Sequence, residues 1–236
     1  MTSIVSAQEL RRVYGEGGAA VTALGGVTVD FPAGAFTAIM GPSGSGKSTL
    51  MHLLAGLDRP TSGTAVLDGT DLTKLSDDAL TQLRRDRVGF IFQAFNLLPV
   101  LNAEENILLP LSIAGRDPDR EWVDQLIDLV GLRDRLTHRP SELSGGQQQR
   151  VAVVRALASR PAVVFADEPT GNLDSVSSTE ILQLLRRSVD DFGQTIIMVT
   201  HDEDAASYAD RLLVLRDGQL VEDRETARAA AEHASV

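Results

Sequence analysis

The length of 236 residues suits one large globular domain, or a domain that carries an inserted lobe. Hydrophobic residues make up 43% of the chain and charged residues 23%, so wholesale disorder is not expected. The 33 acidic and 22 basic residues give a formal net charge of −11, which argues against non-specific binding of nucleic acid. The chain has no cysteine, so disulfides and thiolate metal sites are excluded.

No segment of the sequence predicts a leader peptide or a membrane span. Residues 1–16 lack the apolar core of a signal peptide. Apolar runs stay below the length of about 18 residues that spans a bilayer, and one of the richest, residues 107–113, contains Pro110. We therefore expect a soluble protein in which any role at a membrane depends on a partner.

Alternating strand and helix patterns along the chain favour an α/β fold. Short apolar or β-branched runs predict strands over residues 27–31, 36–40, 88–92, 163–166, 195–200, 211–215 and 219–222. A helical pattern follows the second strand, and further helices are predicted over residues 104–109, 122–130, 146–159 and 176–191. Unbroken apolar runs are typical of parallel strands buried on both faces, so the sheet is predicted to be mostly parallel.

Two regions depart from this alternation. Residues 94–161 show helical periodicity and no clear strand, which predicts a helical lobe inserted into the α/β core. Near the end of the chain, Asp217-Gly218 predicts a hairpin turn between the last two strands. Residues 222–236 are rich in alanine and charge, and they predict a loose helix or tail.

A glycine-rich segment after the strand at residues 36–40 has the P-loop pattern of a glycine, four residues and then Gly-Lys-Ser. The N–H groups of such a loop, which leads into a helix N-terminus, form a receptor for the phosphates of a nucleoside triphosphate. Lys47 is predicted to contact the β- and γ-phosphates and Ser48 to ligate Mg²⁺. A chance glycine-rich turn is disfavoured by the flanking strand and helix. The predicted nucleotide-binding residues here are Gly41, Pro42, Ser43, Gly44, Ser45, Gly46, Lys47, Ser48 and Thr49.

Two carboxylates, Asp167 and Glu168, follow the buried strand at residues 163–166. At the carboxyl edge of a sheet, Asp167 can hold Mg²⁺ through water and Glu168 can orient an attacking water. On its own, this pair could equally well cap the next helix. The P-loop upstream favours the catalytic interpretation.

The pentapeptide Leu143-Ser-Gly-Gly-Gln147 stands about 100 residues after the P-loop and shortly before the carboxylate strand. It is similar to the signature of ATP-binding cassette (ABC) ATPases, and the chain up to about Glu222 resembles an ABC ATPase domain. The resemblance implies a P-loop NTPase core with an N-terminal antiparallel β-subdomain and an inserted helical lobe. It assigns residues 1–223 to the ATPase domain, with the lobe at about 94–161 inside a RecA-like core, and residues 224–236 to a C-terminal tail.

Other positions match the motifs of this family in the family's order. Tyr14 matches the aromatic residue that stacks on adenine, Gln93 the glutamine of the Q-loop, and His201 the switch histidine. The segment Gly171-Asn-Leu-Asp174 matches the D-loop, which assigns Asp174 to the nucleotide site. Without the resemblance, Tyr14 could be a half-buried aromatic, Gln93 a strand-end cap and His201 a surface histidine.

The resemblance also implies a role for each of these side chains. Gln93 approaches Mg²⁺ and reports on a membrane partner, and His201 contacts the γ-phosphate and the attacking water. The implied catalytic residues are Lys47, Gln93, Glu168 and His201, and the implied Mg²⁺ ligands are Ser48, Gln93 and Asp167.

The signature begins a second helical pattern, so its N–H groups can receive another anion. In the family, the signature of one subunit closes over the ATP of the other. The resemblance therefore implies a head-to-tail homodimer that holds ATP and Mg²⁺, although a helix-capping serine beside loop glycines remains the alternative. The signature residues assigned to the nucleotide are Ser144, Gly145, Gly146 and Gln147.

Residues 89–99 and 166–175 resemble one branch of the family, which contains lipoprotein-release, macrolide-export (MacB-like) and cell-division (FtsE-like) ATPases. The branch implies a cytoplasmic subunit on the inner face of the cell membrane, which touches the membrane only through a separate permease and binds no nucleic acid. The residues implied to receive the permease, unless they form ordinary lobe core, are Phe95, Asn96, Leu97 and Leu98, together with the lobe. Ala35 and Val154 depart from the usual Glu and Ala, but neither supplies a chemical group.

Three rival functions remain open at this stage. A soluble ABC protein of translation or DNA maintenance is disfavoured by the single cassette and the lack of cysteine and heptads. A subunit that uses nucleotide only as a dimerisation switch is disfavoured by intact Lys47, Glu168 and His201. An FtsE-like regulator of cell-wall remodelling is not separated from an exporter. The cargo is not encoded here, because the permease normally selects it.

Overall fold

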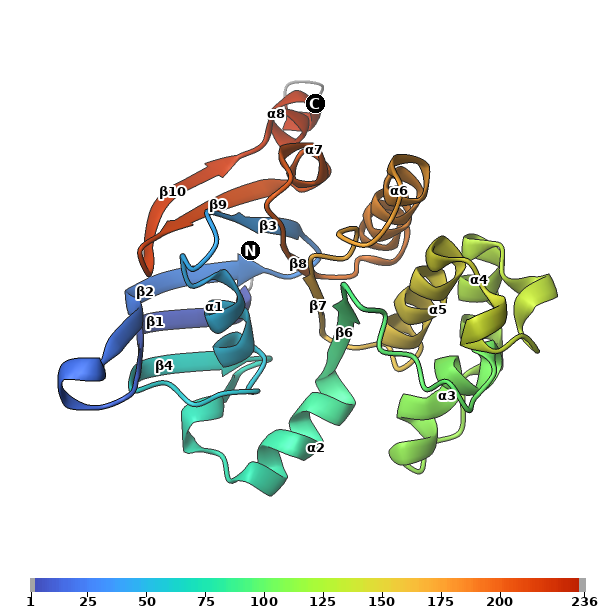
Figure 1. The fold of residues 1–236 in the computed structure, drawn as a ribbon, viewed down its shortest axis with the longest axis horizontal. Helices are drawn as coiled ribbons and strands as arrows, with labels where there is room; N and C mark the ends of the chain where they lie inside the picture. Colours follow the sequence, from blue (N-terminus) through green and yellow to red (C-terminus); the bar gives the residue numbers. More distant parts are fainter. Residues whose placement is uncertain (1–2, 234–236) are drawn as a thin grey trace.

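The computed structural model describes residues 3–233, and its centre is a six-stranded sheet (Figure 1). The strand order is β10-β9-β3-β8-β7-β6, in which β10 runs antiparallel to β9 and the other neighbours are parallel. The strands are β3 (Phe36–Met40), β6 (Val88–Phe92), β7 (Val163–Asp167), β8 (Ile196–Val199), β9 (Arg211–Arg216) and β10 (Gln219–Glu225).

Both faces of the inner strands β3, β7 and β8 are buried, which explains why these strands are almost entirely apolar. Side chains alternate between the faces along each strand. In β7, Val163 and Phe165 pack with the N-terminal sheet, whereas Val164 and Ala166 pack with the helices of the opposite face. The sheet therefore separates two hydrophobic cores.

A four-stranded antiparallel sheet, in the order β2-β1-β4-β5, covers one face. Its strands are β1 (Ser3–Tyr14), β2 (Val21–Pro32), β4 (Ser62–Leu67) and β5 (Thr70–Asp71). Helix α1 (Lys47–Leu54) contacts strands of both sheets, so it is packed between them. The apolar side chains that face inward from α1 are Leu50, Met51, Leu53 and Leu54.

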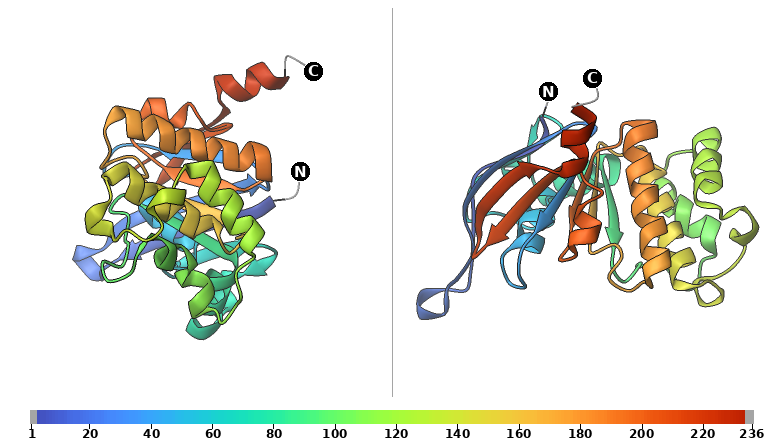
Figure 2. Two further views of the ribbon diagram at one scale, coloured as in Figure 1. Left: turned by 90° about the vertical axis from the view of Figure 1, so that its right-hand side faces the viewer. Right: turned by 90° about the horizontal axis from the view of Figure 1, so that it is seen from above.

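Helices cover the opposite face of the central sheet, and several form a lobe at the side of the molecule (Figure 2). Between residues 94 and 161 the structure has helices and turns but no strand. The single tryptophan, Trp122, is buried in this lobe and donates its indole N–H to the carbonyl of Leu157. The helices on this side are α3 (Ala103–Ile113), α4 (Arg120–Val130), α5 (Gly145–Leu157) and α6 (Ser175–Phe192), while α2 (Asp77–Arg87) precedes β6.

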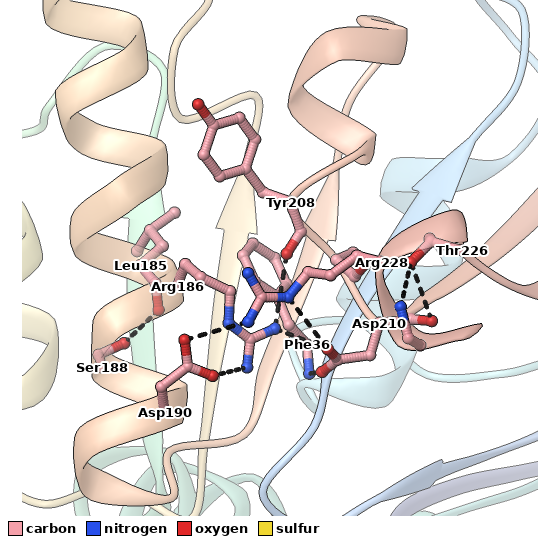
Figure 3. Close-up of polar contacts among 11 residues, drawn as sticks. Phe36, Leu185, Arg186, Ser188, Asp190, Tyr208, Asp210, Thr226 and Arg228 are labelled. Atoms are coloured by element: carbon pink, nitrogen blue, oxygen red, sulfur yellow. Dashed lines mark hydrogen bonds and ion pairs between the residues drawn. The ribbon is translucent and has the colours of Figure 1, made fainter. Parts of the chain in front are cut away.

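The C-terminal elements are tied to the core by a cluster of ionic contacts (Figure 3). Arg186 of α6 pairs with Asp190 and with Asp210, which precedes β9, at 2.7 and 2.8 Å. Asp210 accepts the N–H of Phe36, and Arg228 of α8 (Ala227–His233) pairs with Asp190. The cluster thus joins α6, the start of β3 and the C-terminal helix.

The predicted elements overlap the observed ones, although β2 begins six residues before its predicted start and α3 ends four residues after its predicted end, and five helices and strands were not predicted. The strand at residues 36–40 is β3, and the hairpin at Asp217-Gly218 joins β9 to β10. The last strand was expected to end at residue 222 but continues to Glu225, so it crosses the proposed start of the tail. That division of the chain into domain and tail stays a prediction. The helices and strands that the sequence patterns missed are β1, β4, β5, α2 and α7 (Glu203–Ala206).

Within residues 3–233, no helix is both long enough and apolar enough to cross a membrane.

Candidate active site

The candidate residues lie where four neighbouring parallel strands end. The P-loop follows β3, His201 lies just beyond β8, Asp167 ends β7, and Gln93 follows β6. These strands are adjacent in the order β3-β8-β7-β6, so their carboxyl ends share one edge of the sheet. Ligands of open α/β sheets bind outside this edge.

One cavity of about 600 Å³ contains the P-loop. Glu168 and His201 line the same cavity, although they lie more than 100 residues away in the sequence. The structure therefore brings together the predicted phosphate receptor and two of the predicted catalytic residues. The lining consists of Ala23, Gly41, Pro42, Ser43, Gly44, Ser45, Gly46, Lys47, Ser48, Thr49, Glu168 and His201.

The P-loop backbone curls around the side chain of Lys47. The ammonium donates to the carbonyls of Gly41 and Pro42 at 2.8 and 2.9 Å, and the residue is only 8% exposed. Gly46 has φ +99 and precedes α1, in the left-handed region that favours glycine. A Cβ at Gly46 would also overlap the carbonyl of Ala23. This position therefore requires glycine for two independent reasons.

Glu168 and His201 form a polar pair across the ends of β7 and β8. Oε1 of Glu168 lies 3.1 Å from Nδ1 of His201. Glu168 has φ +46, which is uncommon for a residue with a side chain, and its N–H is held by the carbonyl of Val199. Such strained conformations cluster at functional sites because the surrounding structure enforces them.

Asp167 is half-buried beside this pair. Burial raises the pKa of its carboxyl group, and the charge of Glu168 acts in the same direction, while His52 and Lys47 oppose the rise. A cation near Asp167 would offset the cost of keeping this carboxylate charged. The contribution of His52, from the middle of α1, was not visible in the sequence.

Gln93 lies against the segment that follows Glu168 and Pro169. Its Nε2 donates to Oδ1 of Asn172 at 3.1 Å, and Nδ2 of Asn172 donates to the carbonyl of Gln93 at 3.0 Å. Gln93 is not among the residues that line the P-loop cavity. Sequence reasoning selected Asp174 from this segment, but Asn172 is the residue that meets Gln93.

Tyr14 stands on the N-terminal sheet, outside the residues that line the P-loop cavity. The residue is 40% exposed, and the guanidinium of Arg12 lies 4.5 Å from the centroid of its ring. Its hydroxyl donates to Asp58 at 2.8 Å. The ring is thus held at the surface by two charged neighbours, and its stacking on a base stays a prediction.

The signature lies at the N-terminus of α5. Strands β6 and β7 stand between α5 and α1, the helix that follows the P-loop (Figure 1). Ser144 is exposed and forms a capping box with Gln147, in which each side chain accepts the other residue's N–H. The signature contributes nothing to the cavity of its own P-loop. Asp174 similarly caps α6, and the N–H and hydroxyl of Ser177 lower the pKa of its carboxyl group.

Helix α5 also holds the segment around Gln93. Arg155 donates to the carbonyls of Phe95 and Asn96 at 2.8 and 2.6 Å. Phe95 and Asn96 have φ +61 and +50, so the guanidinium stabilises a left-handed turn. Burial lowers the pKa of Arg155. No local sequence pattern indicates this contact, because Arg155 and Phe95 are 60 residues apart in the chain.

Comparison with known proteins agrees with this geometry. The profile of the ABC transporter family matches residues 24–171. A macrolide export ATP-binding/permease protein MacB of Marinobacter nauticus is 48% identical over 222 residues, which cover 93% of this chain and 34% of that protein. An uncharacterized ABC transporter ATP-binding protein of Methanocaldococcus jannaschii is 45% identical over 93% of this chain and 98% of its own length.

Solved structures point the same way. A dimeric ATP-binding cassette in a post-hydrolysis state with ADP and Pi superposes with a TM-score of 0.84 at 40% identity, covering 94% of this chain and 98% of that chain. The MacB relatives are longer, and this chain spans about a third of their length.

A P-loop at the carboxyl edge of a parallel sheet, with a glutamate and a histidine in the same cavity, defines an α/β P-loop nucleoside triphosphatase. The chain belongs to the ABC transporter family, and it is an ABC ATPase.

Proposed function

We propose that two copies of this chain bind ATP and Mg²⁺ head to tail and drive a separate permease of the MacB or lipoprotein-release type. One observation carries the dimer proposal. The P-loop, Glu168 and His201 share a cavity to which the exposed signature of the same chain contributes nothing. A second copy can supply the missing signature, as an isologous two-fold arrangement does for both sites at once. Related cassettes have been solved as dimers.

Side chains at the carboxyl edge of the central sheet offer oxygen atoms of the kinds that fit a magnesium ion. Ser48, Gln93 and Asp167 offer hydroxyl, amide and carboxylate oxygens, which Mg²⁺ prefers, and phosphates usually complete its coordination. The raised pKa of Asp167 indicates a carboxylate that gains from a nearby cation. Bound Mg²⁺ would neutralise charge that develops on the phosphates during hydrolysis.

The remaining roles belong to the chain itself. P-loop N–H groups and Lys47 hold the phosphates, and Tyr14 stacks on the base. Glu168 orients and deprotonates water for attack on the γ-phosphate, while His201 holds Glu168 and the phosphate in register. Closure over ATP brings the partner's signature and D-loop onto the nucleotide, including the positions of Ser144 and Asp174. Hydrolysis then reopens the dimer.

The permease is proposed to dock in a groove of about 380 Å³ between β6, α3 and α5. Its lining is mainly apolar, and Ile113 at its rim is 69% exposed. Among residues 95–98, which the sequence selected, Asn96 lines the groove and Leu98 is 44% exposed, whereas Leu97 packs against the lobe core. Through this groove the subunit is held at the membrane.

Two inactive variants test the head-to-tail arrangement. Lys47→Ala removes the phosphate-binding ammonium, and Ser144→Arg blocks the signature. Neither homodimer should retain ATP. In an equal mixture, half of the dimers are mixed, and each mixed dimer has one site with an undamaged P-loop and an undamaged signature. Roughly a quarter of the wild-type ATP retention should therefore return.

Retained ATP is measured after gel filtration in a Glu168→Gln background, which slows hydrolysis. If each site used the P-loop and signature of one chain, the mixture would retain no more ATP than the two variants do alone. That outcome would exclude the head-to-tail dimer.

A further inference from the structure

Gln149 is a fully buried polar residue in the middle of α5, five positions after Ser144. Its Nε2 donates to the carbonyl of Phe92 at 3.3 Å and to the carbonyl of Pro169. Phe92 immediately precedes Gln93, and Pro169 immediately follows Glu168. One amide therefore holds the chain beside two candidate site residues that come from different strands.

The position of these carbonyls makes the contact specific. Phe92 pairs with Asp167 in the register between β6 and β7, so both carbonyls lie at the same edge of the sheet. Glu168 adopts φ +46 between them, and Pro169 has no N–H with which to join the sheet. The carbonyl of Pro169 lies beyond the end of β7 at a buried position, so it needs a donor from outside the sheet, and α5 supplies it.

A second contact from α5 acts on the same segment. Arg155 holds the carbonyls of Phe95 and Asn96, so α5 fixes both ends of the stretch that contains Gln93. Gln149, unlike Arg155, also donates to the turn that follows Glu168. Its Oε1 is buried and has no hydrogen-bond partner among residues 3–233. An unpaired buried oxygen is costly, and a residue that serves only packing would avoid it.

We propose that Gln149 is a positioning residue for ATP hydrolysis, which ties Gln93 and Glu168 to the helix that begins with the signature. The inference rests on the proposed catalytic roles of Glu168 and Gln93. In a head-to-tail dimer, the signature touches the partner's nucleotide, so Gln149 links each site to the nucleotide bound at the other. Closure of one nucleotide site then fixes the position of Glu168 in the other site of the dimer.

The test compares Gln149→Met, which keeps length but loses the donor, with Gln149→Asn, which keeps the donor but is one methylene shorter. Both should lower kcat roughly 10- to 100-fold, because small misplacements of reacting groups are costly. The KM for ATP should stay within about threefold, since no phosphate-binding group has moved. Phosphate release by the full chain with Mg²⁺ and ATP gives both constants.

Gln148→Met is the matched control. Gln148 neighbours Gln149 on α5, but among the described residues its side chain donates only to the carbonyl of Leu143, just before the same helix. Its kcat should stay within about twofold of wild type. The Tm of each variant is measured as well, and rates are compared well below the lowest Tm.

Wild-type kcat in either Gln149 variant would overturn the inference, as would a rise in KM that accounts for the whole loss. If one variant does not fold, the other decides. Lys47→Ala, measured in the same assay, shows whether a negative result counts against the role of Gln149 or against the proposed ATPase site. An active Lys47→Ala chain would reject the proposed site itself, whereas an inactive one beside an active Gln149→Met rejects only the positioning role.

Discussion

Asp167 shows how a site residue can be held at a cost to stability. Burial raises the pKa of this carboxyl group, so the folded state binds its proton more tightly than the unfolded state does. The resulting stability is fully present below the unfolded pKa and is lost as the pH rises through the folded pKa. At neutral pH, the ionised carboxylate of Asp167 therefore lowers the free energy of unfolding of the nucleotide-free protein.

We expect Asp167→Asn to raise the Tm at pH 7.5, without nucleotide or Mg²⁺, by roughly 1–3 °C. The amide is neutral at every pH, so it escapes the penalty for burying charge. The gain should shrink as the pH falls toward the ordinary aspartate pKa of 3.8, because the wild-type carboxyl group then takes up its proton. Asp167→Asn should also abolish ATP hydrolysis, because the proposed Mg²⁺ site loses its carboxylate charge. A stability gain that is independent of pH would show that desolvation of Asp167 is not its cause.

Glu168 carries the proposed chemistry, and its replacement separates binding from hydrolysis. Glu168→Gln keeps the shape of the side chain and its contact with His201, but it cannot take a proton from water. We expect hydrolysis to fall at least about 100-fold, with ATP binding retained and the dimer trapped in its ATP-bound form. Phosphate release and light scattering with ATP measure the two effects. Hydrolysis at the wild-type rate would rule out Glu168 as the base.

At the scale of single elements, neighbouring arginines on α6 illustrate the difference between buried and exposed ion pairs. Arg186 is 8% exposed and bonds to Asp190 and Asp210 (Figure 3). Burial disfavours its charge, yet the bonds to these aspartates outweigh that effect and raise its pKa. Arg187 pairs with Asp191 at 3.5 Å, with both side chains about half exposed.

We expect Arg186→Met to lower the free energy of unfolding by about 2–3 kcal/mol, because it leaves Asp210 without its buried partner. Arg187→Met should cost less than about 0.5 kcal/mol. Urea unfolding of both variants gives the comparison. Equal losses would mean that burial of the Arg186 cluster contributes nothing of its own.

How far the elements follow from sequence depends on the strength of their patterns. The strands β3, β6, β7 and β8 are apolar runs, so they were predicted to within one residue at each end, whereas the exposed and mostly polar β10 extends three residues beyond its predicted end. Strand β1 was missed because it mixes polar and apolar residues and carries a bulge at Glu9, with φ +47, that breaks the alternation. Helix α2 was missed because Leu80 is its one buried residue, which leaves no apolar stripe to detect.

The candidate site divides in the same way. The P-loop, Glu168 and His201 lie in contiguous motifs, and the structure brings them into one cavity. The contacts of Gln93 with Asn172 and of Arg155 with Phe95 join distant segments, so no local pattern reveals them. Gln149 stands in a run of three glutamines, and only the packing of α5 shows which one is buried.

At the scale of the whole molecule, the nucleotide cavity and the groove beside α3 are separate surfaces that share no lining residue. They are joined through β6 and α5, whose residues line the groove and hold the segment around Gln93. A permease seated in the groove therefore contacts the elements that fix the site. This arrangement allows docking to be disrupted without touching the nucleotide.

We expect Ile113→Asp to abolish copurification with a coexpressed permease, because it places a charge on the apolar rim of the groove. ATP binding and hydrolysis by the isolated chain should stay within about twofold of wild type, since Ile113 is 69% exposed and lines no part of the nucleotide cavity. Val221→Asp, on the strand at the far edge of the sheet, is the control and should copurify normally. Retention of the permease by Ile113→Asp would place the docking surface elsewhere.

The four strand ends that carry the site also fix the distances between its residues. Hydrogen-bonded strands lie about 4.8 Å apart, so the ends of β3, β8, β7 and β6 mark out a row about 14 Å long. Hydrogen bonds between the strand backbones set the distance from each strand end to the next, and the packing of side chains in the two cores does not change it. Substitutions in either hydrophobic core should therefore change the stability of the sheet, while the distances between the site residues at its edge stay the same.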